Sequence, residues 1–373
     1  MINRRNFLKT VLAGGFIIGT GSLLSACKGI IRNDLQPPGG ALETTPGLDE
    51  TDVTILHYAS LAPSGHNSQP WFVKIIGPKK WIVGIDSQRR LPAVDPENRE
   101  ALLSIGAFIE NLSIAAGTLG FQIQTEIVAK TSMDEEIVKI SLIKAKPVKY
   151  PLERIIKRRT IRSGFQSVEI RSSDFLALSE PLKDRLFYIP RDTEHAQCIQ
   201  EGAVENFKAQ SYRAEAQKEL SQWMHLKTSD AKKHRSGLTT ESMEISGFTG
   251  WYVRAFMDKE DVMKESFIKR GIDKVAKQAV EGGGWFIITS RGEGISDLIN
   301  TGRRFERMAL KAREHKLAIH PMTQFLEEKE GRDAIAKNHD DSMIPQFVLR
   351  VGYLSNYPDP VSLRRPVSWF IRT

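Results

Sequence analysis

Residues 62–73 of this 373-residue chain read Ala62-Pro63-Ser64-Gly65-His66-Asn67-Ser68-Gln69-Pro70-Trp71-Phe72-Val73. Pro63 fixes its own φ angle, and the small residues Ser64 and Gly65 let a backbone approach a ligand closely. Asn67 and Gln69 each add a carbonyl and an amide group. These groups suit a planar polar heterocycle, although the same turn residues also fit an ordinary surface loop ahead of a strand at 71–76.

The N-terminal residues have the pattern of an export signal. Arg4-Arg5-Asn6-Phe7-Leu8-Lys9 precedes an uncharged run from Thr10 to Ala26, which is at the short end for a membrane span. The paired arginines are typical of twin-arginine export. Leu24-Ser25-Ala26-Cys27 resembles a lipobox, so we expect residues 1–26 to be a signal peptide and Cys27 to be lipidated. A chance cysteine at this place is the alternative.

The segment 27–47 contains Pro37-Pro38-Gly39-Gly40 and is predicted to be a lipid-attached tether that does not pack. We therefore expect a lipoprotein held at a membrane on the extracytoplasmic side of the cell envelope. Removal of residues 1–26 takes away Arg4, Arg5 and Lys9 and no acid, so the formal charge falls from +8 to +5. This modest excess, without dense basic runs among aromatics, predicts no nucleic-acid partner.

Cysteine and histidine usage also limits the chemistry. With Cys27 acylated, Cys198 has no disulfide partner within the chain. The eight histidines and two cysteines show no metal-ligand spacing, so no metal site is expected.

Two segments share a Gly-x-x-x-Glu frame within helical apolar patterns, one at 104–112 and one at 300–308. Each helix is predicted to continue into a strand, at 121–128 and 317–320, and each unit then reaches a second strand, at 137–143 and 347–351. Two amphipathic helices can share such a frame by chance, but the repeated order of elements favours two similar units.

Residues 62–71 resemble the flavin-binding loop of the nitroreductase superfamily, which follows a helix, here 49–61. Arg158-Arg159-Thr160-Ile161-Arg162-Ser163-Gly164-Phe165 resembles the arginine motif of that family, with Thr160 in place of serine. Segments 91–100 and 320–324 look like the Acg-like branch of single-chain, often twin-arginine-exported members. The resemblance implies an α+β nitroreductase fold with helix-covered sheets, in which halves 48–150 and 151–373 form a fused pseudo-dimer.

In that family, the loop and the arginine motif that meet at one flavin come from different subunits, which implies different halves here. A basic residue beyond a C-terminal strand and Gly-Tyr reaches the phosphate, which implies Arg365 or, as second choice, Arg364. The complementary site lacks both motifs, so one FMN per chain is implied. The candidate cofactor-binding residues are Pro63, Ser64, Gly65, Asn67, Gln69, Arg158, Arg159, Thr160, Arg162, Arg364 and Arg365.

The resemblance implies an FMN-dependent oxidoreductase that passes electrons to a small-molecule acceptor such as a nitroaromatic or a quinone. Hydride moves directly to and from the flavin ring in this family, so no catalytic side chain is assigned. The donor is left open between NAD(P)H and a membrane quinol, and residues 223–257 lie where related proteins place a lid. Two alternatives are a protein that sequesters flavin without turnover and a structural lipoprotein that has lost the cofactor.

Overall fold

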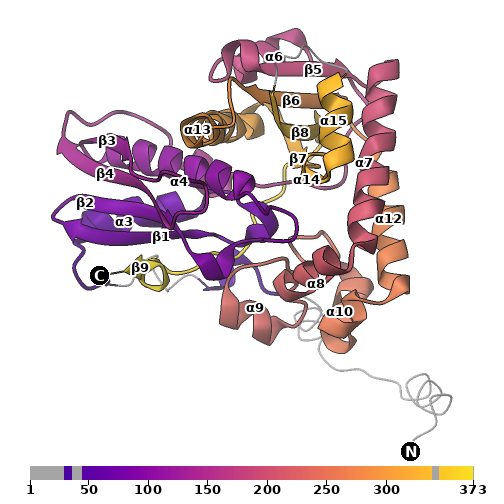
Figure 1. Ribbon diagram of the computed structural model, residues 1–373, viewed down its shortest axis with the longest axis horizontal. Helices are drawn as coiled ribbons and strands as arrows, with labels where there is room; N and C mark the ends of the chain where they lie inside the picture. Colours follow the sequence, from indigo (N-terminus) through magenta and orange to yellow (C-terminus); the bar gives the residue numbers. More distant parts are fainter. Residues whose placement is uncertain (1–28, 36–43, 338–343, 373) are drawn as a thin grey trace, which may run out of the picture.

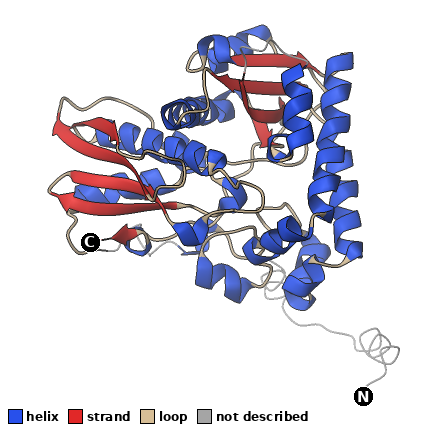
Figure 2. Cartoon of the chain, viewed as in Figure 1, coloured by secondary structure: helices blue, strands red, loops and turns tan. Residues whose placement is uncertain are grey.

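The computed structural model describes residues 29–35, 44–337 and 344–372; the expected signal peptide and Cys27 lie outside the described residues. The chain has an α+β fold, as predicted, with two separate sheets flanked by helices (Figures 1 and 2). The strand order is β3-β4-β2-β1-β9 in the first sheet and β5-β6-β8-β7 in the second. The strands are β1 (Trp71–Gly77), β2 (Lys80–Ile85), β3 (Phe121–Ile127), β4 (Glu136–Lys144), β5 (Leu186–Pro190), β6 (Gly284–Ser290), β7 (Leu317–Pro321), β8 (Ile344–Tyr353) and β9 (Ile371–Arg372).

The helices surround and separate these sheets, and the longest are α4, α7 and α13. The α-helices are α3 (Glu50–Ser60), α4 (Arg99–Thr118), α5 (Glu153–Lys157), α6 (Ser172–Ser179), α7 (Glu194–Tyr212), α8 (Ala214–Trp223), α9 (Thr228–His234), α10 (Gly247–Phe256), α11 (Lys259–Val262), α12 (Glu265–Ala279), α13 (Ile295–Ala312), α14 (Gln324–Glu327) and α15 (Lys329–Lys337).

The two sheets repeat one order of elements. Strands β1 and β2, helix α4, and strands β3 and β4 build the first sheet, and β5, β6, α13, β7 and β8 build the second. Apart from β9, which the C-terminal residues add to the first sheet, the four strands of each unit lie in the order third, fourth, second, first, and their neighbouring pairs are antiparallel. A tight turn joins β1 to β2, whereas helices α7 to α12 are inserted between β5 and β6. The insertion is therefore longer than the predicted lid at 223–257.

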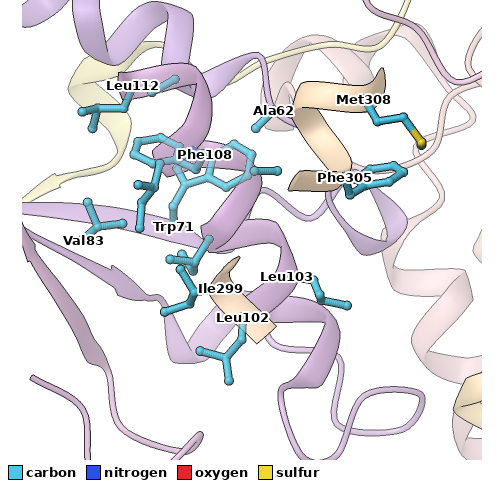
Figure 3. Packing of buried hydrophobic residues seen from close by; sticks show 14 of the residues in the cluster. Ala62, Trp71, Val83, Leu102, Leu103, Phe108, Leu112, Ile299, Phe305 and Met308 are labelled. Carbon is cyan, nitrogen blue, oxygen red and sulfur yellow. The ribbon is translucent and has the colours of Figure 1, made fainter. Parts of the chain in front are cut away.

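The long helices α4 and α13 pack against each other at the two glycines of the repeated frame. A Cβ atom on Gly106 would collide with the carbonyl oxygen of Ile299, and one on Gly302 would collide with the carbonyl oxygen of Leu103. Figure 3 shows side chains of both helices, including Leu103 and Ile299, in the common core. Glycine in both helices thus allows a close backbone crossing between the two units.

The glutamates of the Gly-x-x-x-Glu frame form ion pairs with arginines of other elements. Glu110 of α4 pairs with Arg303 and Arg307 of α13. Glu306 of α13 is fully buried, and its Oε1 atom lies 3.4 Å from Nε of Arg158. The Gly-x-x-x-Glu pattern therefore marks equivalent positions at the helix contact.

Local sequence signals explain the helix that leads into the Pro63 loop. Asp49 caps α3, accepting a hydrogen bond from the backbone N–H of Asp52 at 2.8 Å in a capping box, and Leu61 ends the helix. Among the described helices, α4 is long and apolar enough to cross a membrane, but 78% of its apolar window is buried inside the protein. Its composition therefore reflects its place in the core.

The structure corrects the expectation that the whole of 27–47 is an unpacked tether. Ile30 is only 5% exposed because it packs with Ala231 of α9 and Leu363 of the C-terminal segment. The backbone N–H of Arg32 donates to the carbonyl of Val361 at 3.3 Å. Apolar contacts and a backbone hydrogen bond to residues remote in sequence thus hold residues 29–35 against the folded protein.

The C-terminal residues cross from the second unit to the first. Strand β9 pairs in parallel with β1, with Ile371 opposite Val73. The segment before β9 runs beside the Pro63 loop, because Arg364 and Arg365 bond to residues of that loop. The last strand of the second half therefore belongs to the sheet of the first half.

Candidate functional site

A cavity of about 300 Å³ lies where the two sequence motifs meet. The loop before β1 contributes Pro63, Ser64, Gly65 and His66, and the arginine segment contributes Thr160 and Arg162. The first segment belongs to the range 48–150 and the second to the range 151–373. The remaining lining residues are mostly apolar or carboxamide and carboxyl side chains: Glu100, Leu103, Ser104, Ala107, Phe207, Gln210, Leu220, Leu238, Phe305, Pro321, Thr323, Gln324, Glu327 and Phe347.

The loop that forms one wall is held in an unusual backbone conformation. His66, Asn67 and Gln69 have φ angles of 49°, 52° and 52°, in the left-handed region that non-glycine residues seldom adopt. The hydroxyl of Ser64 accepts a hydrogen bond from the backbone N–H of Gln69 at 2.9 Å. Clustered backbone strain of this kind occurs at ligand sites, where the surrounding structure must maintain it.

The two carboxamides of the loop hold the loop in place and do not line the cavity. The Asn67 amide nitrogen donates to the carbonyl of Gly237 at 3.1 Å, and its oxygen accepts from Arg364 at 2.9 Å. Gln69 is fully buried; its oxygen accepts from the backbone N–H of Arg365 and its nitrogen donates to the carbonyl of Arg235, both at 2.9 Å. Their role as flavin ligands stays a prediction.

Of the five arginines expected at the cofactor, Arg162 lines this cavity. Its guanidinium donates to the carbonyl of Ser242 at 2.7 Å, and its backbone N–H donates to the Glu244 carboxylate at 3.1 Å. Since only part of the guanidinium fork is used in these contacts, Arg162 can also donate to an anionic ligand.

The other four arginines bind groups of the protein outside the cavity wall. Arg158 lies against the buried Glu306, and Arg159 pairs with Glu244 at 3.3 Å. Arg364 donates to the carbonyls of Leu61 and Ala62, both at 3.1 Å, and Arg365 donates to those of Gln69 and Trp71 at 2.7 and 2.8 Å. In the structure Arg364 and Arg365 thus satisfy backbone carbonyls around the loop, and Arg158 and Arg159 face carboxylates. The role of all four as phosphate ligands stays a prediction.

Residues 235–244 join the two motif segments to each other. The backbone N–H of Gly237 donates to the carbonyl of Asn67 at 3.0 Å, while Ser242 and Glu244 accept from Arg162. Leu238 of the same segment lines the cavity. These residues lie inside the range 223–257 predicted as a lid, and they contact both walls of the site.

Two carboxyl groups in the cavity wall were missed by the sequence analysis. The Glu327 carboxyl accepts from the Thr323 hydroxyl at 2.9 Å and from the Gln210 amide at 2.6 Å. Arg99 donates to Glu100 at 3.1 Å. Burial, with the nearby charge of Glu327, raises the pKa of Glu100 to about 8, so Glu100 holds a proton at neutral pH.

The contact of Glu100 with the loop also gives Gly65 a role. A Cβ atom on Gly65 would lie 3.0 Å from Oε2 of Glu100 and 3.1 Å from Leu91. Gly65 therefore makes room for a carboxyl group as well as for any ligand. No single-residue signal marks Glu100 or Glu327 in the sequence, because they meet only in the folded chain.

Charge and shape together limit what the cavity can hold. Burial, with the positive charge of Arg162, lowers the pKa of His66 to about 4, so its imidazole is neutral at physiological pH. Phe305 and Phe347 stack on each other with ring centroids 4.3 Å apart and form part of the apolar wall. Within the described ranges, no group of three or more His, Cys, Asp or Glu side chains is placed to hold a metal ion. The arrangement suits a planar organic ligand with an anionic group.

The fold and the cavity define an α+β protein built from two repeated units, with one mixed polar and apolar cavity between its motif segments. No known protein-family model matches the chain. The provisionally named NAD(P)H nitroreductase PigM of Serratia sp. is 23% identical over 313 residues, which cover 80% of this chain and 86% of that protein. The provisionally named NAD(P)H nitroreductase acg of Mycobacterium tuberculosis is also 23% identical, over 85% of this chain and 94% of that protein.

A third relative covers a shorter region at higher identity. Another M. tuberculosis protein with a provisional NAD(P)H nitroreductase name is 36% identical over 73 residues, which cover 20% of this chain and 21% of that protein. The chain is thus a distant homologue of proteins named as nitroreductases, and the two longer alignments span most of its length. These relatives support an oxidoreductase of the nitroreductase type.

Proposed function

We propose that this chain is an FMN-dependent oxidoreductase of the nitroreductase superfamily, in its Acg-like single-chain branch, with one flavin per chain. The observation that carries the proposal is the shared cavity of Pro63–His66 and Thr160–Arg162, two segments from different halves that both resemble flavin-binding motifs of that family. The repeated order of elements supports a fused pseudo-dimer as the origin of the chain.

The residues in the cavity wall fit FMN by their chemistry. Arg162 supplies a cation for the phosphate, and Ser64 and Thr160 supply hydroxyl groups. The apolar wall that includes Phe305 and Phe347 would exclude water from the planar ring of a bound flavin. When bound, FMN would supply hydride and electron transfer between a donor and an acceptor.

The carboxyl pair supplies a proton-handling group in the same cavity. Reduction of a nitro group or a quinone consumes protons as well as electrons, and Glu100 is protonated at neutral pH because burial raises its pKa to about 8. Glu327 stays hydrogen-bonded to Thr323 and Gln210, which keeps it in place beside Glu100. We assign Glu100 the role of holding a proton near the acceptor.

The cellular setting follows from the N-terminal sequence. Twin-arginine export moves folded proteins, so a flavin acquired in the cytoplasm can travel with the chain, and lipid on Cys27 would hold it at a membrane. The names of the relatives favour NAD(P)H as electron donor, whereas export favours a membrane quinol, because reduced nicotinamide is scarce outside the cytoplasm.

Single-turnover reduction tests the function directly. The purified mature protein is mixed anaerobically with NAD(P)H or with a soluble quinol, and the flavin absorbance is followed before and after a nitroaromatic or a quinone is added. The proposal expects the colour to bleach with one donor and to return with the acceptor. A protein that carries flavin but reacts with neither donor would support the alternative of flavin sequestration. The observation that favours flavin sequestration is that residues 235–244 contact both walls of the site, which would limit the access of a donor or an acceptor.

A further inference from the structure

The exposed face of helix α10 is strongly aromatic. Phe248, Tyr252 and Phe256 are spaced four residues apart and are 76%, 50% and 60% exposed. Trp251 joins them through ring contacts with Phe248 and Phe256, at centroid distances of 5.3 and 5.5 Å. Such a cluster of large exposed aromatics on one helix needs a partner surface.

Charge is absent from this exposed face. The one charged residue of α10 is Arg254, which is turned inward to the Glu241 carboxylate at 2.7 Å and the Thr240 hydroxyl at 3.1 Å. The exposed positions of the helix are therefore apolar, small or aromatic. An amphipathic helix of this composition, with exposed Phe and Tyr and a half-buried Trp251 among them, is typical of the boundary between lipid headgroups and acyl chains.

The N-terminal segment reaches the protein beside the same helix. Gly29, Ile31, Gly247 and Arg254 line one open cavity of about 750 Å³. Cys27 is two residues from Gly29, and two extended residues span at most about 7 Å. Since Ile30 and Arg32 are buried, the point from which the chain leaves toward Cys27 is fixed near the start of α10.

We propose that the aromatic face of α10, formed by Phe248, Trp251, Tyr252 and Phe256, docks on the lipid bilayer to which Cys27 anchors the chain. The inference rests on the lipid anchor of the proposed function and deepens it, because it fixes the orientation of the protein on the membrane. One lipid group gives attachment without orientation, and the aromatic face adds the second contact.

Docking in this orientation connects the membrane to the cavity through a short chain of contacts. Arg254 of α10 binds Thr240 and Glu241, and the same turn continues to Ser242 and Glu244, which bind Arg162. The segment that covers the site thus lies next to the docking helix, where a membrane-soluble quinone or quinol would arrive.

Depth-dependent quenching of Trp251 fluorescence tests the docking. The mature, lipid-bearing protein is reconstituted in vesicles of phosphatidylcholine with or without brominated acyl chains, and wild type is compared with Trp251→Phe. Trp369→Phe is the matched control, because Trp369 is 48% exposed and lies in the short turn directly before β9, and Figure 1 shows β9 and α10 on different sides of the chain. We expect brominated lipid to quench wild type and the control, and Trp251→Phe to lose that quenching.

A second variant separates docking from attachment. Replacing Phe248, Tyr252 and Phe256 by serine should leave the protein bound to vesicles through Cys27 while Trp251 quenching is lost. Equal quenching of wild type and Trp251→Phe would overturn the proposal. A wild-type protein whose Trp251 is not quenched would also overturn it, whether or not the protein is bound to the vesicles. Self-association that shields Trp251 instead would assign the face to a second copy. Mass spectrometry of Cys27 and the flavin spectrum, taken on the same samples, report separately on the anchor and the proposed cofactor.

Discussion

The pH dependence of folding stability should change in a defined way when Glu100 is replaced by glutamine. In the folded protein, burial and the neighbouring Glu327 raise the pKa of Glu100 from its ordinary value of 4.5 to about 8, while the positive charge of Arg99 opposes this shift. Between these two pH values the unfolded chain has released the proton and the folded chain keeps it. The wild-type free energy of unfolding therefore falls as pH rises through this window. In Glu100→Gln the contribution of this proton to the fall is absent.

The size of the effect follows from one proton. Its contribution to the slope is at most about 1.4 kcal/mol per pH unit between pH 4.5 and about pH 8, and it levels off above that range. Urea unfolding followed by tryptophan fluorescence, at several pH values across the window, measures the two slopes. Glu97→Gln, at an exposed position three residues earlier, controls for the loss of one carboxylate. Parallel curves for wild type and Glu100→Gln would refute the assignment of a protonated carboxyl in the cavity wall.

Three further substitutions test separate parts of the account. Gly106→Ala should destabilise the fold by about 3 kcal/mol in urea unfolding, because its Cβ meets a backbone carbonyl of α13, whereas Gly117→Ala on the same helix has room and should be neutral or stabilising by up to about 1 kcal/mol. Arg158→Met should destabilise the fold at pH 8 by on the order of 1 kcal/mol in urea unfolding and much less at pH 5, because burial raises the pKa of Glu306 to about 7 and the charge of Arg158 opposes that rise, so the carboxyl is charged only at the higher pH; an equal loss at both pH values would contradict this. Wild-type protein extracted from membranes should carry acyl chains on Cys27 in mass spectrometry and Cys27→Ser should carry none; an unmodified Cys27 in the wild type would exclude the lipid anchor at this residue.

Local patterns were sufficient to predict helices α3, α4 and α13 and five strands, β1, β3, β4, β7 and β8, but not the helices inserted between β5 and β6. The helix predicted at 49–61 is α3, whose ends are set by Asp49 and Leu61, and the strand predicted at 137–143 is β4. These elements follow from capping residues and from apolar periodicity, which act over a few residues. The Gly-x-x-x-Glu repeat was also visible, because the same helix contact places the same residue types in both units.

Contacts between segments remote in sequence could not be predicted from local patterns. The pairing of β9 with β1 involves two residues on each strand and leaves no local pattern. Arginine side chains suit a phosphate and a set of backbone carbonyls equally well, so the contacts of Arg364 and Arg365 with the loop could not be foreseen. Glu100 gains its protonated state only through burial beside Glu327, and burial depends on the complete fold.

Titration of the mature apoprotein with FMN, followed by absorbance or by quenching of flavin fluorescence, measures whether one flavin binds in the cavity between the two motif segments. Wild type, Arg162→Ala and the surface control Arg154→Ala are compared, since Arg154 pairs with Glu314 away from the cavity wall. The account predicts one FMN per chain in wild type and in the control, and binding weaker by roughly tenfold or more in Arg162→Ala, because loss of one charge-assisted hydrogen bond costs at least about 1.4 kcal/mol. FMN affinity that is unchanged in Arg162→Ala, or a wild-type protein that binds no FMN, would contradict it.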